Sequence, residues 1–336
     1  MTLKQIAEEL GVSYSTVSRV VNGYTKNFSV KPEVRAMILE KVREYNFKPN
    51  PLYQTLRQKN NRQITFLFPY SLNAVPGSVV GDTVSALETR LAKMNCLFNY
   101  LVDPLSSPES AFHLPPWKAA GLVLADVKHA DQLREVENAE LPYVVINGIC
   151  GPGGTAVVTD ESWNMRCMLE HLSGLGHRRI AYVSVGFSDR DPAQKHYSQR
   201  ERLDAYRRFC EEQQMEPLFL ETSWDGSFAP CVDQLREHGI TAVAAYNTYI
   251  AQRLIRALHD SGLTVPGDIS VAAFNRHDLA AYMIPSLTTL ELPVDEMGST
   301  AADLIVERLK NPDYARGKTY SFRGTLITRE STAKRG

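Results

Sequence analysis

The sequence has little cysteine and no cysteine pattern typical of a metal site or a disulfide framework. Five cysteines are spread over 336 residues, and none belongs to a C-x-x-C pair. Scattered thiols in odd number fit a reducing compartment better than a secreted, disulfide-bonded protein. The histidines His171 and His177 stand six residues apart, which does not place two metal ligands on one helical face. We therefore predict no metal site and no cofactor.

Long apolar runs and leader-like segments are also missing. No run reaches the ~18 apolar residues of a membrane-spanning helix, and the first residues, MTLKQIAEEL, lack the apolar core of a signal peptide. These absences predict a cytoplasmic location. Enzyme signatures are missing too: there is no G-x-S-x-G or H-E-x-x-H motif, and Cys150–Gly154 is glycine-rich without the spacing of a phosphate-binding loop. We predict that the chain has no catalytic residues and is not an enzyme.

An excess of charge of one sign is absent from the whole chain but present in its first part. The formal net charge is −1. Residues 1–63 hold 11 Lys and Arg against 5 Asp and Glu, whereas the remainder holds 26 against 33. A basic first segment on an acidic body is typical of a module that binds a polyanion, because neutralised phosphates supply most non-specific affinity for DNA.

The basic segment begins with the pattern of two short helices joined by a turn. Thr2 followed by Gln5 forms a capping box, and Gly11 ends the helix that they begin. Ser13 can cap a second helix, which the pair Asn22–Gly23 would end. Each helix has one apolar face, made by Leu3, Ile6, Ala7 and Leu10 in the first and by Val17, Val20 and Val21 in the second. This arrangement predicts a helix-turn-helix.

A third helix completes the segment, and the second helix presents hydrogen-bonding side chains. Pro32 suits the first position of the third helix, whose core face holds Val34, Ile38, Val42 and Tyr45. On the second helix we expect an exposed face made of Tyr14, Ser15, Ser18, Arg19 and Asn22. Such side chains can bind base edges, and a guanidinium can bind guanine in a bidentate way. The sequence therefore predicts an all-α DNA-binding domain.

Two stretches of this domain carry a family resemblance. Residues 12–23, VSYSTVSRVVNG, and residues 45–50, YNFKPN, resemble the lactose/purine repressor family of transcription regulators. The resemblance implies that Tyr14, Ser15 and Arg19 are the base-reading positions of the recognition helix. The chain departs from the family pattern in a longer loop before Val30, and in Lys31, where a Ser cap is usual. A weaker cap on the third helix is expected.

The segment after residue 50 has two interpretations. Residues 51–59, PLYQTLRQK, have little apolar content, and isolated helices this short are marginal in water. The residues alone indicate either a linker or a helix that folds only on DNA. The resemblance implies a hinge helix whose Leu56 inserts into the minor groove and kinks the duplex. Tyr53, which replaces a small alanine, and Arg57 lie in the same segment and are included among the DNA-binding residues.

The remaining residues read as alternating strands and helices. Strands are predicted at 64–69, 97–102, 121–124, 143–146, 156–158, 180–185, 242–245 and 269–274, and helices at 78–94, 161–175, 200–214, 248–261 and 295–309. This alternation predicts parallel, doubly wound sheets. Too many strands occur for one sheet of usual size, so we expect two lobes.

The family resemblance extends through this body and specifies its organisation. Residues 170–181, EHLSGLGHRRIA, together with Pro285–Thr289 and Arg329–Thr332, resemble further family landmarks. They imply a periplasmic-binding-protein-like body in which the chain crosses three times between lobes and a ligand binds in the cleft. The expected domains are 1–50 for the helix-turn-helix, 51–62 for the hinge and 63–332 for the body. Its N-lobe would comprise about 63–160 and 291–318, and its C-lobe about 161–290 and 319–332. Because no heptad tail follows Thr332, we expect a homodimer.

Candidate effector-binding residues come from the resemblance and from the predicted strand ends. Arg202 matches the family's effector-binding arginine, Asn247 and Asn275 follow predicted strands, and Trp224 stands where relatives place a stacking aromatic. Trp224 as a buried core residue is an equal alternative. Asn147 and Ser71 occupy matching N-lobe positions. Planar amides, one arginine and an aromatic face suit a polyhydroxyl ligand.

Two further observations refine the expected effector. Asn275 stands where sugar-binding relatives usually carry Asp, so the ligand could present an acidic or carbonyl group to this amide. Residues 73–80 supply no aromatic pair for a purine, so we rank purines below sugars. The sequence thus predicts a ligand-responsive DNA-binding regulator, a repressor of carbohydrate-related genes that binds near-palindromic operator DNA. The alternative is a sugar-binding protein without a DNA role, which would have no use for Tyr14, Arg19 and Leu56.

Overall fold

The computed structural model describes residues 2–21, 30–45, 62–68, 79–102, 110–115, 117, 119–185, 195–223, 226–275 and 278–335. The chain divides into two compact units, Met1–Asn61 and Arg62–Gly336, which we call the head and the body. Six of the candidate residues lie outside the described residues: Asn22, Tyr53, Leu56, Arg57, Ser71 and Trp224. No helix of the described residues is long and apolar enough to cross a membrane.

The head contains the expected helices, α1 (Leu3–Glu9), α2 (Tyr14–Val21) and α3 (Pro32–Glu44). The capping box is present, since the Gln5 amide N–H donates to Thr2 Oγ1 and the Thr2 amide N–H donates to the Gln5 side chain. Ser13 caps α2 through its hydroxyl, which accepts from the Thr16 amide at 3.1 Å. Lys31 makes no side-chain cap on α3, as expected.

One small apolar core holds the three helices together. Ile6, Val17 and Ile38, one from each helix, are fully buried in it. Glu9 of α1 binds α3 at the surface, through Lys41 Nζ at 2.7 Å and the Tyr45 hydroxyl at 3.0 Å. Both contacts lower the pKa of Glu9. The apolar faces predicted from helical periodicity are therefore the ones that pack.

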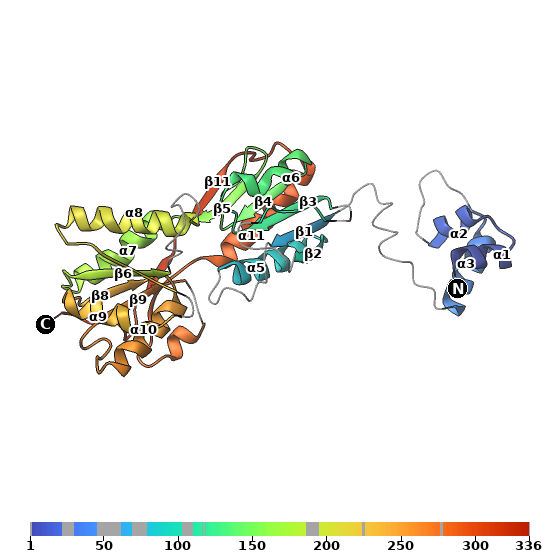
Figure 1. The fold of residues 1–336 in the computed structure, drawn as a ribbon. Helices are drawn as coiled ribbons and strands as arrows, with labels where there is room; N and C mark the ends of the chain where they lie inside the picture. The colour runs from blue at the N-terminus through green and yellow to red at the C-terminus, as the bar shows by residue number, and fades with distance from the viewer. Residues whose placement is uncertain are drawn as a thin grey trace. The chain divides into compact units, whose positions relative to one another are not determined.

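The first sheet of the body is parallel, in the order β11-β5-β4-β3-β1-β2. Its strands are β1 (Gln63–Phe68), β2 (Leu97–Val102), β3 (Gly121–Ala125), β4 (Tyr143–Ile146), β5 (Thr155–Thr159) and β11 (Thr319–Phe322). Helices α5 (Val79–Lys93) and α11 (Val294–Lys310) pack on one face, and η1 (Ala130–Leu133) with α6 (Arg134–Asn138) on the other. We call this layered unit the first lobe (Figure 1).

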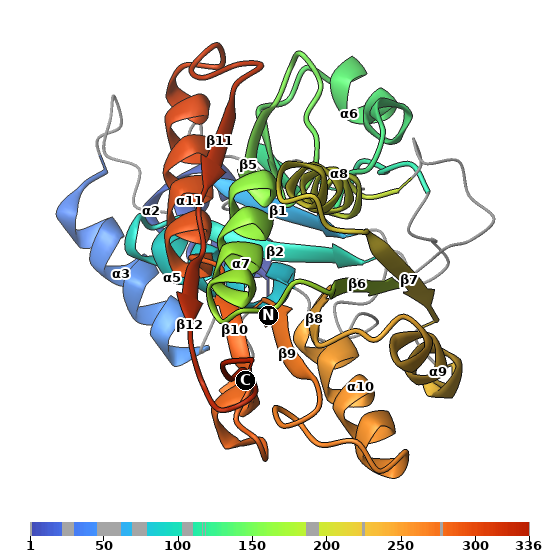
Figure 2. The same cartoon turned by 90° about the vertical axis from the view of Figure 1, so that its left-hand side faces the viewer.

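The second sheet has the order β12-β10-β9-β8-β6-β7, and only the edge strand β12 is antiparallel. Its strands are β6 (Ile180–Val185), β7 (Leu218–Thr222), β8 (Ala242–Ala245), β9 (Ser270–Phe274), β10 (Thr288–Glu291) and β12 (Thr325–Ile327). Helices α7 (Glu161–Gly174) and α8 (Tyr197–Glu212) cover one face, and α9 (Ala229–Glu237) and α10 (Thr248–Asp260) the other (Figure 2). A short helix, η3 (Asp278–Tyr282), precedes β10. We call this unit the second lobe.

The chain crosses between the lobes three times, after β5, after β10 and after β11, as expected. The predicted fold class, a helical head with two doubly wound α/β lobes, is confirmed. One lobe boundary is wrong. Residues 319–322 were expected in the C-lobe, but they form β11, which pairs with β5 in the first sheet. Tyr320 and Phe322 pack against the first lobe's core, which explains why this strand stays there.

Candidate functional site

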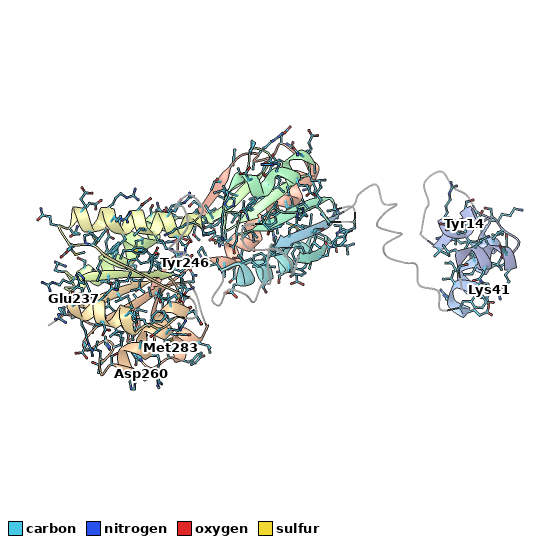
Figure 3. The ribbon with its side chains drawn as sticks, viewed as in Figure 1. Tyr14, Lys41, Glu237, Tyr246, Asp260 and Met283 are labelled. Atoms are coloured by element: carbon cyan, nitrogen blue, oxygen red, sulfur yellow. The ribbon has the colours of Figure 1, made fainter. Side chains whose placement is uncertain are left out.

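The three predicted base-reading side chains lie on the exposed side of α2. Tyr14 is 49% exposed, and Ser15 and Arg19 are exposed as well. Figure 3 shows Tyr14 at the surface of the head. The Ser15 hydroxyl lies 2.8 Å from that of Ser13, the capping residue. The helix thus presents a phenol, a hydroxyl and a guanidinium on one accessible side, which are groups that can hydrogen-bond to base edges.

Ser18 does not share this exposure. It was predicted on the exposed face of the second helix, but its exposed fraction is 5%. The reason is that α2 packs against both α1 and α3, so its buried side is wider than the stripe made by Val17, Val20 and Val21. Ser18 therefore belongs to the packed side of the helix.

In the body, polar side chains gather at the carboxyl ends of two neighbouring strands of the first sheet. Asp126 follows β3 and Asn147 follows β4. Both have a positive φ of 55°, which Asp and Asn tolerate better than most residues. The Asn147 Nδ2 donates to Asp126 Oδ1 at 2.6 Å. Carboxyl ends of parallel strands are the usual position of ligand sites in α/β folds.

The N-terminus of α8 brings the second lobe to these strand ends. His196 Nε2 lies 2.7 Å from the backbone oxygen of Asn147, and the Tyr197 hydroxyl donates to Asn147 Oδ1 at 3.1 Å. The same hydroxyl lies 3.0 Å from Thr159 Oγ1, at the end of β5. Two consecutive residues of the second lobe therefore contact two strand ends of the first. We call Asp126, Asn147, Thr159, Glu161, His196, Tyr197, Arg202 and Asn275 the interlobe cluster.

The protonation state of His196 follows from its surroundings. Burial lowers its pKa, although Asp126 and the Asn147 carbonyl act in the opposite direction. A neutral imidazole has one N–H, and Nε2 faces the Asn147 oxygen whereas Nδ1 faces the Ser198 amide and hydroxyl. The proton is accordingly assigned to Nε2, and Nδ1 accepts from the Ser198 amide. His196 is a neutral bridge between the lobes.

Arg202 lies deeper in the cluster, where it forms a buried ion pair. Its exposed fraction is 2% and that of Glu161 is 1%. Arg202 Nε and Nη2 donate to the two carboxylate oxygens of Glu161 at 2.7 and 2.9 Å. Nη1 donates to the backbone oxygen of Tyr246 at 2.7 Å, and the guanidinium carbon lies 4.0 Å from the centre of the Phe274 ring. Figure 3 shows Tyr246 on the side of the second lobe turned toward the first.

The two asparagines predicted at strand ends have different roles. Asn247 caps α10, since its Oδ1 accepts from the Ile250 amide at 2.9 Å, and it is 2% exposed. Asn275 follows β9 with a φ of 72°, and its Oδ1 lies 3.5 Å from Arg202 Nη2. Asn147, Arg202 and Asn275 thus lie in one cluster, whereas Asn247 caps α10.

Sequence reasoning missed five members of the cluster: Asp126, Thr159, Glu161, His196 and Tyr197. Asp126 had a usable signal, because it directly follows an apolar strand, as Asn147 does. Glu161 stands at the first position of a helix, where a carboxylate is common for reasons of the helix dipole alone. His196 and Tyr197 begin a helix that was predicted from residue 200. Their contacts join segments about 50 residues apart, which periodicity does not reveal.

A basic helix-turn-helix head followed by two α/β lobes with polar strand ends between them defines a DNA-binding regulator with a ligand-binding body. Residues 2–50 match the family described as bacterial regulatory proteins, lacI family, and residues 169–332 match the periplasmic binding protein-like domain. The chain belongs to the lacI family of transcription regulators.

Relatives align along nearly the whole chain. The transcriptional repressor PurR of Aliivibrio fischeri is 26% identical over 99% of both chains. The ribose operon repressor of Escherichia coli is 28% identical over 93% of this chain and 94% of its own. The lac repressor dimer bound to operator and the anti-inducer ONPF has a similar fold, with 24% identity, a TM-score of 0.77 and 99% of each chain covered. These relatives are transcription repressors and not enzymes, in agreement with the prediction from the sequence.

Proposed function

We propose that this protein is a repressor of carbohydrate-related genes that releases or binds its operator in response to a sugar or sugar derivative. The alignment with both the repressor PurR and a ribose operon repressor leaves the effector class open. The observation that carries the choice of a sugar is the interlobe cluster. It combines the amides of Asn147 and Asn275 with hydroxyl groups, a set that offers both donors and acceptors to a polyhydroxyl ligand.

The proposed output is the docking of α2 in the major groove. Tyr14, Ser15 and Arg19 would contact bases, and Ser18 would pack against the head instead. Two heads of a homodimer would occupy two half-sites of a near-palindromic operator in the cytoplasm. Asn22, Tyr53, Leu56 and Arg57 lie outside the described residues. We keep their assigned DNA contacts, with Leu56 as the minor-groove wedge, as part of the proposal.

A homodimer is supported by apolar side chains that the body exposes near η3. Leu279 is 57% exposed, Tyr282 is 80% exposed and Ile284 is 96% exposed. A contiguous exposed apolar patch marks an interaction surface, and we propose that these three neighbouring side chains belong to one. Their burial by a second copy would bring two bodies together, and each body carries one head.

The proposed input is a ligand held between the lobes by Asn147, Arg202 and Asn275, with Asn247, Ser71 and Trp224 as further candidates. His196 and Tyr197 already join the two lobes by hydrogen bonds, so a ligand at this position would change how the lobes contact each other. By linkage, the operator would alter ligand affinity by the same factor as the ligand alters operator affinity.

Fluorescence anisotropy tests this proposal with a labelled fragment of the promoter next to the protein's own gene. Titrations are run with and without neutral sugars that raise the melting temperature of the purified protein. The expected result is tight binding at this fragment and a change in affinity of at least 10-fold on adding an active sugar. A protein that binds the fragment no better than random DNA would contradict the DNA role. Sugars that stabilise it without altering operator affinity would contradict the regulatory role.

A further inference from the structure

The ion pair between Arg202 and Glu161 is closed within the protein. A guanidinium has five N–H donors, and four hydrogen bonds link Arg202 to acceptors among the described residues: two to Glu161, one to the Tyr246 backbone oxygen and one to Asn275. Phe274 covers one face of the guanidinium. An incoming carboxylate or phosphate would have to displace Glu161 to form a bidentate contact with Arg202.

Glu161 is held as firmly as its partner. Its Oε1 accepts from the Thr159 hydroxyl at 2.6 Å and from Arg202, and its Oε2 accepts from Arg202 as well. It is the first residue of α7, where the positive end of the helix dipole stabilises a carboxylate. Because both partners are at least 98% buried, displacing one leaves the other as an uncompensated buried charge. Displacement of Glu161 by a ligand anion is therefore unfavourable.

The carboxyl groups around the pair add to this effect. Glu201 precedes Arg202 on α8, and its pKa is raised by burial and by the nearby carboxylates of Glu161 and Asp160. Asp126, which follows β3 in the first lobe, lies with its Oδ1 3.9 Å from His196 Nε2. His196 is neutral because burial lowers its pKa, so it offers no positive charge to an anion. Lys128 of the first lobe is a cation whose charge also lowers the pKa of His196.

We infer that Glu161 is a specificity residue, a built-in counter-ion of Arg202 that restricts the effector to neutral, hydroxyl-rich molecules and disfavours sugar acids and sugar phosphates. This inference rests on the proposed function, since it concerns the same ligand site. The sequence led us to expect an acidic or carbonyl group of the ligand at Asn275. The inference excludes the acidic group and retains the carbonyl group. Arg202 contributes to such a site through its fixed position, with its Nη2 lying 3.5 Å from Asn275 Oδ1.

The experiment compares matched probes on the full-length protein by thermal shift and calorimetry. The pairs are D-glucose against D-gluconate and D-glucose 6-phosphate, and D-ribose against D-ribose 5-phosphate, at equal ionic strength. The wild-type protein is expected to be stabilised by at least one neutral sugar and to bind the matching anion at least 10-fold more weakly. The inference would be overturned if the anionic member of a pair stabilised the protein more than the neutral member. It would also be overturned if none of the neutral sugars stabilised the protein.

Two variants separate the role of Glu161 from a general charge effect. Glu161→Gln keeps the shape of the side chain and releases the guanidinium from its carboxylate, so anion affinity is expected to rise at least 10-fold. Glu201→Gln removes the same charge from the neighbouring position without touching these contacts, and it should change anion affinity less than 3-fold. An equal gain in both variants would contradict the counter-ion role. If Glu161→Gln does not fold, the comparison of neutral and anionic sugars on the wild-type protein tests the inference by itself.

Failure of the inference and failure of the proposed function give different results. A protein that prefers an anionic sugar and releases its operator on binding it retains the function but not the inference. A protein that binds neutral sugars selectively without any change in operator affinity retains the inference but not the regulatory function.

Discussion

Removal of the Glu161 carboxylate should be among the most destabilising single changes in the body. Arg202 is 2% exposed, and two charge-assisted hydrogen bonds of 2.7 and 2.9 Å join its guanidinium to Glu161. Glu161→Ala removes both hydrogen bonds. Breaking a buried ion pair by deleting one partner costs about 3–5 kcal/mol. The loss exceeds the value of the hydrogen bonds themselves, because the remaining charge is not rehydrated. We expect a decrease of this size in the free energy of unfolding of the body.

The same helix offers a matched control. Glu170 also lies on α7 and also pairs with an arginine, Arg166, at 2.8 Å, but the side chains are 57% and 49% exposed. Exposed pairs of this kind contribute about 0–1 kcal/mol, so Glu170→Ala should be nearly neutral. Arg166 also pairs with Glu212 at 2.7 Å. The two variants therefore differ in burial and in whether the remaining arginine keeps a carboxylate partner.

Urea unfolding followed by circular dichroism measures both variants against the wild type. A lower midpoint with an unchanged slope reports a loss of stability without a change in the surface exposed on unfolding. The expected order is Glu161→Ala far below Glu170→Ala, which stays close to the wild type. If the two variants unfold within about 1 kcal/mol of each other, the argument that burial makes this ion pair critical is refuted.

Three further predictions concern the head and the lobe contact. Arg19→Ala should weaken binding to the operator by about 1–3 kcal/mol in an anisotropy titration and leave binding to random DNA nearly unchanged; an equal loss on both would argue against base reading. Ile38→Ala should destabilise the head by about 2–5 kcal/mol, seen as lost operator binding while the unfolding transition of the body stays in place. Burial lowers the pKa of His196, so its contribution to stability is present above its ordinary pKa of 6.5 and is lost as pH falls below that value. His196→Gln should therefore flatten the acid side of the stability profile, by at most about 1.4 kcal/mol per pH unit, and an unchanged profile would contradict a neutral buried imidazole.

Helical periodicity predicted most of the helices that build the head and the lobes. The helix expected at 78–94 is α5, Val79–Lys93, and the one expected at 248–261 is α10, Thr248–Asp260. Each buries an apolar stripe against a sheet, so the pattern that packs the helix is also the pattern visible in the sequence. The helix α8 begins three residues earlier than expected, since its cap, His196, is not among the usual capping residues.

Short strands were less visible, for a physical reason. The strands β7 (Leu218–Thr222) and β10 (Thr288–Glu291) were not predicted. Strand β7 lies at the edge of its sheet and carries only one buried side chain, and β10 reads TTLE, with three buried residues of which two are threonines. Pairing with neighbours in the sheet makes these segments strands, and that pairing is not encoded in an apolar run.

The candidate site was predicted from strand ends and from the family resemblance, and it was missed where tertiary contacts decide. Asn275 was predicted at the end of an apolar strand, whereas Asn147 and Arg202 were predicted from the resemblance. Glu161, His196 and Tyr197 act through partners on other elements, so no local pattern marks them. Ser18 shows the converse, since its local pattern suggested exposure and the packing of α2 between two helices buried it.

The backbone at the strand ends connects the fold to the proposed specificity. Asp126, Asn147 and Asn275 each follow a strand with a positive φ, a conformation in which most side chains are strained. At such positions the backbone itself favours glycine, Asn or Asp, so the fold restricts these positions to short polar side chains or glycine. Glu161 and Arg202 are under no such backbone constraint, and burying an ion pair is often no more stabilising than an apolar pair of the same size. The selective role inferred above accounts for the cost of their burial at the proposed ligand site, and for this reason the charge of the effector is the property to test.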